Sequence, residues 1–418
     1  MKSKLYTLIL FTLIFASIVH NDLYAQGCVA VRQMGGNVIG TSNGYNLPKG
    51  NFQIGVGYRY FHSFRHFVGT EEKPFRQNTQ GGFDANGNEL GNAVNIYSHA
   101  IDLNISYALS NRLQLNLALP YVKNERSQVL RISNEGTIEI EDQQVPHAKE
   151  AQRYSVFAQG IGDVRVSANY WLFDPANAQK GNLMLGLGVK LNTGSYTRRD
   201  DGIKLNEEGE VVSDPQVMMD QAIQPGDGGI GISLELQGFR QVYKGIYAFA
   251  SGYYLFNPRE SNGTFKSAPS TIKDKDGNTL GILTGYNVYA SPDQYLARAG
   301  FMTSVLKDKS LTLSLAARWE GIPAYDAFGG QVAYRRPGYV VAVEPGVAYT
   351  VHGKHTFSLI IPFNFIRNRI QSAADIASQN LQNSVITEES EKVHVQGDAA
   401  FADYSINYTY YFRFGKNQ

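Results

Sequence analysis

Hydrophobic and polar residues alternate one by one along twelve stretches of the chain. A period of two is the pattern of a β-strand whose two faces meet different surroundings. The last stretch shows it most clearly, because the even positions from Tyr404 to Phe414 are all aromatic or aliphatic and the odd positions are mostly polar. The alternation predicts strands at residues 51–60, 101–109, 113–119, 164–172, 183–191, 230–236, 247–255, 295–301, 311–319, 339–349, 357–365 and 404–414.

The predicted strands are joined in turn by short and by long connections. Short turns fall near residues 110–111, 174–180, 243–245, 307–309 and 352–354, and long polar segments cover residues 65–94, 123–155, 196–228, 258–293, 321–337 and 368–399. An even number of strands with turns at one end and long loops at the other is typical of an outer-membrane β-barrel. The sequence therefore predicts an all-β fold over residues 51–418. This fold is a transmembrane antiparallel up-and-down β-barrel of about twelve strands, with short periplasmic turns and long extracellular loops.

A soluble β-sandwich is the alternative fold, because its strands also alternate between apolar and polar residues. A sandwich would not sort its connections so regularly into two length classes. It would also not often place Tyr and Phe at the ends of the apolar rows, where they match the aromatic girdles at the two membrane interfaces. Both observations favour the barrel.

Each predicted strand has an apolar row that we expect to face lipid and an opposite row that we expect to face the lumen. In the seventh strand, the row assigned to lipid is Tyr247, Phe249, Ser251, Tyr253 and Leu255. An Arg or Lys that faces lipid at the middle of the bilayer costs about 2–4 kcal/mol. Charged residues confined to the other rows are therefore candidates for lining the lumen. They are Arg59, Asp102, Asp163, Arg165, Lys190, Glu235, Arg298, Arg318, Glu320, Glu344, Asp403 and Arg413.

The lumen candidates comprise six bases and six acids, which leaves two interpretations open. The charges can pair across neighbouring strands and hold the wall in shape, or some of them can line a constriction that selects solutes by charge. Twelve strands predict a narrow lumen, because about eight strands enclose only side chains and about 16–18 leave an open channel. Residues 27–50 hold several glycines and no strand pattern, so we expect a segment that either plugs the periplasmic mouth or stays flexible.

The first 26 residues predict a secretory signal peptide. Lys2 and Lys4 precede a short apolar run, and Ala25 supplies a small residue at a suitable cleavage point. The run is too short to be a comfortable transmembrane helix, which needs about 20 apolar residues. Cys28 follows closely, so lipidation as in bacterial lipoproteins is a second interpretation, although the residues before it fit such a site poorly. A tolerated free thiol is the third.

The chain between about residues 155 and 260 resembles a known family of outer-membrane channels, the one assigned to the meta-pathway of phenol degradation. The matching segments are Gly160-Ile161-Gly162-Asp163-Val164-Arg165, Asn169-Tyr170-Trp171-Leu172, Gly181-Asn182-Leu183, Leu191-Asn192-Thr193-Gly194 and Pro225-Gly226-Asp227-Gly228-Gly229. Asn192 departs from the family pattern, which usually has Pro there. The resemblance implies a barrel of roughly twelve strands that acts as a passive uptake channel, often for small hydrophobic or aromatic compounds.

Composition excludes several other classes of protein. A mean hydropathy of −0.27 is too polar for a bundle of membrane-spanning helices, and a net charge of +1 gives no electrostatic basis for binding nucleic acid. A single cysteine cannot form an internal disulfide or a Cys-based zinc site. His62 and His66 are four residues apart, but in a predicted loop that spacing does not place them on a common face. No nucleophile elbow or phosphate loop is present, so we expect neither an enzyme nor a cofactor.

Two functions remain compatible with the sequence. The first is passive uptake of small, hydrophobic or aromatic molecules through a narrow lumen. The second is a non-conducting barrel that serves as an anchor or as a surface interaction protein, because the loops make up a large share of the chain. The expected partners are outer-membrane lipid, a small-molecule solute and the barrel-assembly machinery during biogenesis.

Overall fold

The fold is that of a computed structural model, which describes residues 46–133, 136–140, 143–266, 269–274, 277–329 and 333–415. The predicted signal peptide, Cys28 and residues 27–45 of the predicted N-terminal segment lie outside the described residues. Residues 46–50 lie at the short-turn end of the barrel, where the Gly50 amide donates to the Ala108 carbonyl at 2.8 Å.

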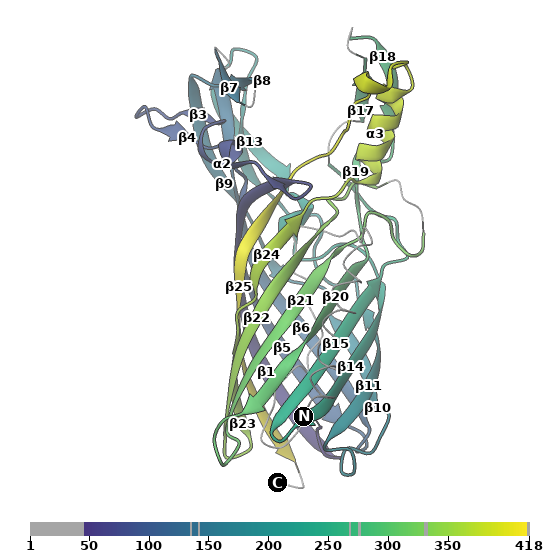
Figure 1. Cartoon of the computed structure of the whole chain (residues 1–418). Helices are drawn as coiled ribbons and strands as arrows, with labels where there is room; N and C mark the ends of the chain where they lie inside the picture. The colour runs from purple at the N-terminus through teal and green to yellow at the C-terminus, as the bar shows by residue number, and fades with distance from the viewer. Residues whose placement is uncertain are drawn as a thin grey trace, which may run out of the picture.

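The chain forms a closed antiparallel β-barrel of twelve wall strands, which confirms the predicted fold class (Figure 1). The barrel closes where the first and last strands pair, from Asn51↔Gly415 to Phe67↔Ala399. The wall strands are β1 (Asn51–Val68), β5 (Asn95–Ala108), β6 (Leu113–Ser133), β9 (Glu150–Ile161) with β10 (Arg165–Trp171), β11 (Gly181–Lys190), β14 (Gly231–Tyr243), β15 (Ile246–Phe256), β20 (Gln294–Ser304), β21 (Leu311–Ile322), β22 (Gly338–Val351), β23 (His355–Ile360) with β24 (Phe363–Asn368), and β25 (Ala399–Gly415).

Two wall strands are interrupted. The fourth breaks between β9 and β10 at residues 162–164, and the eleventh breaks between β23 and β24 at Ile361 and Pro362. Proline lacks the amide hydrogen that a ladder needs, which explains the second break. Above this break, β24 and β25 share a single ladder pair among the described residues, Phe363↔Tyr404.

The outer face of the barrel is an apolar belt. Large hydrophobic side chains point outward from neighbouring strands, as Leu185 and Leu187 do on β11 and Leu234 on β14. Near the short-turn end, the ring of Phe52 lies 4.5 Å from Tyr107 and 5.5 Å from Phe414, between ring centroids, as expected for an interfacial aromatic girdle. A closed wall with such a belt is a transmembrane barrel of a Gram-negative-type outer membrane.

The seventh predicted strand, β15, is inverted relative to the prediction. Ser251, Tyr253 and Leu255 are buried inside the barrel, whereas Ala250 on the opposite row is exposed to lipid. Register explains the inversion, because Ser251 stands directly opposite Arg298 of β20, whose side chain is buried inside. Both rows of β15 are largely apolar, so hydrophobicity alone did not distinguish them. The correction places Tyr247 and Phe249 on the inner wall as well.

This orientation of β15 predicts a difference in thiol labelling. In a variant with Cys28 replaced by Ser, Tyr247→Cys is expected to react with a water-soluble maleimide, because Tyr247 lines a cavity at the short-turn end of the lumen. Ala250→Cys, on the lipid face, is expected to react at least tenfold more slowly, since a membrane-impermeant reagent does not reach it. An electrophoretic shift on heating shows that each variant is folded. Equal labelling of the two folded variants would contradict the inward orientation of Tyr247.

The long connections hold more regular structure than the sequence predicts. The β6–β9 ladder continues from Tyr121↔Ile161 to Ser133↔Glu150, so residues 123–133 and 150–155 are strand and not loop. The hydrophobic alternation ends where the wall rises above the bilayer, but the backbone ladder continues, and a ladder in water needs no apolar face. Further elements there are β2 (Glu71–Glu72), α2 (Pro74–Asn78), β3 (Gly82–Phe83), β4 (Glu89–Leu90), β7 (Gly136–Ile140), β8 (Gln143–His147), β12 (Arg199–Leu205), β13 (Val211–Met218), η2 (Gln221–Ile223), β16 (Ser261–Phe265), β17 (Ser270–Lys273), β18 (Thr279–Leu283), β19 (Val288–Ala290), α3 (Ala373–Asn383) and η3 (Glu389–Glu391).

Two groups of these elements rise above the rim. One contains α2, β3, β4, β7, β8, β9 and β13, and the other contains α3 packed beside β17 and β18 (Figure 1). A capping box of Ser372 and Asp375 begins α3 and satisfies its first free amides. None of the helices among the described residues is long and apolar enough to span a bilayer.

Candidate functional site: the barrel lumen

Eleven of the charged candidates lie at inner-facing positions of wall strands, and Asp163 lies in the break between β9 and β10. The twelve are not one cluster. Most of them are buried, with Asp102 and Arg318 partly buried and Asp403 exposed by 40% of its side chain. They divide into a central group, an extracellular group and separate residues near the two ends of the wall. Their burial shows that side chains fill the space around them inside the wall.

The central group surrounds Glu344 of β22. Arg298 and Arg318 stand directly opposite each other on β20 and β21. Arg298 forms an ion pair with the Glu344 carboxylate at 2.8 Å, and Arg318 donates a hydrogen bond to it at 3.1 Å. Arg318 also binds Glu320 at 2.8 Å. Like charges directly opposite in a ladder repel, so Glu344, with 1% of its side chain exposed, compensates both arginines at once.

Two further candidates contact residues on other strands. Arg59 of β1 interacts electrostatically with Asp102 and with Glu320, which lies across the lumen from it. Arg165 of β10 donates to the Tyr253 hydroxyl at 2.9 Å. Arg59 and Asp102 lie on the neighbouring strands β1 and β5, as the pairing interpretation expects. The contacts of Arg59 with Glu320 and of Arg165 with Tyr253 connect strands that are not neighbours in the wall.

Glu235 and Arg413 lie apart from the central group. Glu235 Oε1 is buried without a hydrogen-bond partner among the described residues. Arg413 Nε donates to Gln53 Oε1 at 2.7 Å, close to the short-turn end. Glu235 interacts electrostatically with Arg165.

Asp403 lies at the extracellular part of the wall, beside the seam between β24 and β25. Arg65 binds its carboxylate at 2.7 Å and Arg367 at 2.5 Å. Asn364 Nδ2 and Arg367 Nε donate to the Ala402 carbonyl at 3.0 and 3.1 Å. Side chains thus close the seam where the backbone ladder is missing, which gives Asp403 a structural role in the wall.

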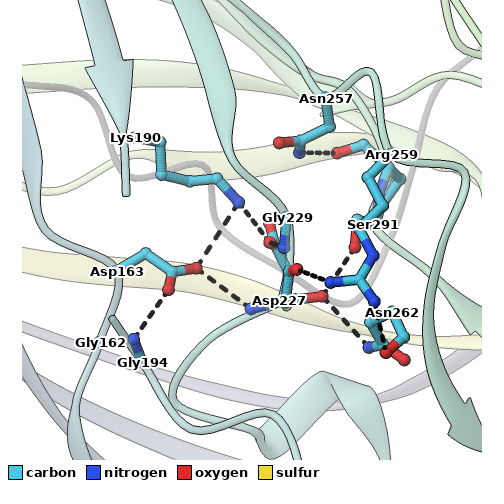
Figure 2. Close-up of polar contacts among 12 residues, drawn as sticks. Gly162, Asp163, Lys190, Gly194, Asp227, Gly229, Asn257, Arg259, Asn262 and Ser291 are labelled. Carbon is cyan, nitrogen blue, oxygen red and sulfur yellow. Dashed lines mark hydrogen bonds and ion pairs between the residues drawn. The ribbon is translucent and has the colours of Figure 1, made fainter. Parts of the chain in front are cut away.

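The extracellular group is built around Asp163 and Lys190 (Figure 2). The Lys190 ammonium, 1% exposed, lies 3.6 Å from Asp163 Oδ2 and makes a close ion pair with Asp227. Asp163 accepts the backbone amides of Gly194 at 2.9 Å and Asp227 at 3.1 Å. Asp227 was not among the charged candidates, although the sequence motif Pro225–Gly229 contains it.

Three glycines from the sequence motifs, Gly162, Gly194 and Gly226, pack together beside Asp163. A Cβ on Gly226 would lie 2.5 Å from the Gly194 carbonyl oxygen, and a Cβ on Gly194 would lie 2.9 Å from the Gly162 carbonyl carbon. Contacts that short exclude any side chain. The three backbones therefore pack directly on one another, and this packing allows the amides of Gly194 and Asp227 to reach the Asp163 carboxylate.

Residues 219–227, which we call the crossing segment, pass through the upper lumen. Met219 and Ile223 pack with Ile96 of β5 and Val156 of β9, and Asn124 Nδ2 donates to the Ile223 carbonyl at 2.8 Å. Ala222 also packs against a second cluster from the far side of the barrel, consisting of Phe67 of β1, Val340 of β22, and Ala399 and Phe401 of β25. Contact with both walls makes this segment a constriction.

Hydrogen bonds fix both ends of the crossing segment. The Asp227 carbonyl accepts Asn262 Nδ2 at 3.1 Å and the Ser291 hydroxyl at 2.9 Å, and Arg259 Nη1 donates to the Gly228 carbonyl at 2.9 Å (Figure 2). Asp220, at the opposite end, receives two hydrogen bonds from Arg336, at 2.9 and 2.7 Å. Burial would raise the pKa of Asp220, but the charge and hydrogen bonds of Arg336 outweigh it and hold the pKa well below its usual range.

Below the constriction, aromatic side chains line one side of the inner wall. Trp171 of β10 lies edge-on to Phe239 of β14 with ring centroids 6.1 Å apart, and Tyr247 of β15 lies 6.2 Å beyond Phe239. Phe249 and Tyr253 continue the series along β15, where the guanidinium groups of Arg298 and Arg165 lie over their rings at 5.5 and 5.7 Å. We call Trp171, Phe239, Tyr247, Phe249 and Tyr253 the aromatic row.

Two cavities lie at the ends of the aromatic row. A cavity of about 810 Å³ at the short-turn end is lined by Trp171, Phe239 and Tyr247, and we call it the periplasmic vestibule. A smaller cavity of about 110 Å³ lies under the crossing segment, with Arg59 and Arg165 in its lining. The row therefore begins at the vestibule and ends at Tyr253, whose hydroxyl accepts a hydrogen bond from Arg165 in the lining of the smaller cavity.

The histidines serve structure. His62 stacks on Tyr97 with centroids 4.1 Å apart, whereas His66 binds Asp398 at 2.7 Å through Nδ1 and accepts the Val94 amide at 3.0 Å through Nε2. Burial would raise the pKa of Asp398, but the His66 hydrogen bond and the charge of Arg76 lower it to about 2. Among the residues that the structure describes, no group of three His, Cys, Asp or Glu side chains is placed to hold a metal ion.

Comparison with known proteins gives only a distant likeness. No family model and no curated protein matches the chain. An outer-membrane channel from Pseudomonas putida F1 aligns at 11% identity and a TM-score of 0.47, over 88% of this chain and 97% of that one. A FadL homologue from Pseudomonas aeruginosa aligns at 10% identity and a TM-score of 0.37, over 88% and 91%. The toluene transporter TodX from P. putida aligns at 11% identity and a TM-score of 0.39, over 89% and 91%. At these scores nothing about the cargo of this chain follows, and the resemblance to the phenol meta-pathway family stays a resemblance of sequence motifs.

Proposed function

We propose that this protein is a passive outer-membrane channel for small molecules that carry an aromatic or apolar part. The observation that carries the proposal is the aromatic row, which follows one side of the inner wall from the periplasmic vestibule to Tyr253. Rings on the row offer a solute stacking contacts that replace water, and such pairs contribute about 0.5–1.5 kcal/mol each beyond the area they bury. Movement would be downhill, driven by the concentration difference alone.

The constriction determines when a solute can pass through such a channel. The cavity of about 110 Å³ under the crossing segment is smaller than ordinary small-ligand sites, which begin at about 300 Å³. A solute therefore passes only when the crossing segment shifts. The segment is held mostly by ion pairs and hydrogen bonds to loops and wall, and such contacts can open without unfolding the barrel.

A non-conducting surface protein is the second candidate function. The observation in its favour is that the crossing segment contacts both sides of the lumen, while α3 with β17 and β18 forms a structured projection above the rim (Figure 1). Electrical measurement separates the two candidates, because only the channel carries ions.

The experiment is a single-channel recording of the purified protein in a planar bilayer. We expect discrete currents that benzyl alcohol interrupts in a concentration-dependent way, because a ring resting on the aromatic row obstructs the ions. Phe249→Ala should weaken this block severalfold, since it removes the middle of the row. Phe365→Ala, whose ring faces lipid with 58% exposed, is the matched control and should leave the block unchanged. No current under any condition would support the non-conducting alternative instead.

A further inference from the structure

A separate pocket of about 290 Å³ lies on the other side of the crossing segment, toward the extracellular loops. Arg126 of β6, Tyr154 of β9, Lys266 after β16, and Tyr289 and Arg336 line it, and Met219 forms part of its floor. Tyr289 and Arg336 also line the small cavity beneath the segment. The two cavities therefore meet at the same side chains, with the crossing segment between them.

Two cations in this pocket have no acidic partner within ion-pair distance among the described residues. Arg126 hydrogen-bonds the neutral amide of Gln128, and the Lys266 ammonium lies 4.1 Å from the centre of the Tyr334 ring. Burial, and then the nearby charge of Arg336, lower the pKa of Lys266. Asp220 interacts electrostatically with both cations, and an anion in the pocket would be attracted by the same two charges.

The acids in the pocket are already engaged. Asp214 binds Lys204 at 2.8 Å, and Asp220 takes the two hydrogen bonds of Arg336. The loop that carries Arg336 is fixed by the neighbouring pair of Arg335 and Asp326, at 2.5 Å with both side chains 1% exposed. Asp220 thus shows the geometry in which a carboxylate meets Arg336 at this site, because two parallel bonds from one guanidinium suit a planar carboxylate.

The rest of the lining offers polar surface and a smaller apolar surface. Tyr154 and Tyr289 supply rings, and Val156, Met218 and Met219 supply aliphatic and thioether surface. Methionine adapts its shape and contacts aromatic rings favourably. The volume matches the lower end of small-ligand sites, which begin at about 300 Å³. Charge and lining together select one chemical class, a single ring that bears a carboxylate.

We infer that this pocket is an entry site for small aromatic carboxylates. The carboxylate binds between Lys266 and Arg126 and competes with Asp220 for Arg336, while the ring rests on the tyrosines. Displacing Asp220 would free the crossing segment at one of its anchors, so that loading of the pocket favours passage. This inference rests on the proposed channel function and names its solute class.

Equilibrium binding to the full-length protein in detergent tests the inference, with benzoate as the probe at pH 7. Isothermal titration is expected to show saturable binding of benzoate, and at least tenfold weaker binding of benzyl alcohol, which lacks the charge, and of acetate, which lacks the ring. Lys266→Gln and Arg126→Gln should each weaken benzoate at least fivefold. Lys392→Gln is the matched control, because Lys392 is an exposed lysine paired with Glu389 on η3, and it should bind benzoate as the unaltered protein does.

The outcomes separate this inference from the channel itself. If benzoate does not bind the unaltered, heat-modifiable protein, or binds no better than benzyl alcohol, the entry-site inference is wrong. Neither result affects the single-channel currents. Unchanged affinity in both Lys266→Gln and Arg126→Gln overturns it as well. Saturable benzoate binding without any current would retain the pocket and reject the channel. The comparison of benzoate, benzyl alcohol and acetate uses the unaltered protein. It therefore tests the inference even if a variant fails to fold.

Discussion

Replacing Lys190 with methionine is expected to raise the single-channel conductance severalfold and to make the current noisier. Lys190 is the cation between Asp163 and Asp227, and its removal leaves two buried carboxylates that repel each other. Breaking a buried ion pair on one side costs about 3–5 kcal/mol. The barrel has many other contacts, so we expect this free energy to appear first as release of the crossing segment from β10 and β11. Planar-bilayer recording measures the conductance, and urea titration measures the unfolding free energy.

Two further variants test that explanation. Asp227→Asn combined with Lys190→Met removes one of the two carboxylate charges and should recover part of the lost stability, while the conductance stays high because the ion pair is still absent. Lys244→Met removes an exposed lysine in the β14–β15 turn and should change neither quantity. A folded Lys190→Met protein with the conductance of the unaltered one would show that the crossing segment is not the constriction.

The strand prediction succeeded where one face of a strand is polar and failed where neither is. On β11, glycines and Lys190 oppose a row of leucines and valines, and the inner and outer faces follow directly. On β15 the two rows differ little in hydrophobicity, and only pairing with Arg298 of β20 shows which row is inside. The aromatic row was therefore hidden, because the rule that apolar residues face lipid assigned Tyr253 to the wrong side.

The constriction could not be predicted from alternation at all. The crossing segment lies in a long polar connection that resembles the other five in composition, and its partners are far away in the sequence. Pro225–Gly229 resembles a family motif, but the sequence does not show that Gly226 packs on Gly194 and Gly162. In hindsight, three glycine motifs that each adjoin a wall strand are the signal that several loop backbones meet at one place.

The entry pocket could not be predicted for the same reason, because the sequence does not show which loops meet. Lys266 and Arg126 lie in connections that were predicted as loops, where charged residues are usually solvated. Arg126 lies on β6 only because that strand continues above the bilayer, and Lys266 faces it only because loops after β13, β16 and β21 fold inward. A net charge of +1 therefore conceals an uneven local distribution, with Arg126, Lys266 and Arg336 gathered in one pocket.

The second large effect is expected at Glu344. Glu344→Gln should lower the unfolding free energy by about 3–5 kcal/mol, because it leaves Arg298 and Arg318 facing each other on adjacent strands with one carboxylate fewer between them. Glu320 still binds Arg318, so Arg298 is the residue that loses its ion pair. The temperature at which the protein loses its compact electrophoretic mobility should fall. The added net positive charge in the lumen should also shift the reversal potential in a salt gradient toward anion selectivity.

A compensating change separates the charge effect from a packing effect. Glu344→Gln combined with Arg298→Met removes both members of the broken pair, and a buried ion pair replaced by apolar side chains of similar size is often neutral or stabilising. The double variant should therefore be more stable than Glu344→Gln alone, and its reversal potential should return toward that of the unaltered protein. Glu391→Gln, on exposed η3, should alter neither property. If the double variant is less stable than Glu344→Gln, Arg298 holds the wall by contacts other than its ion pair, and the compensation between the two opposed arginines is not the reason for the loss.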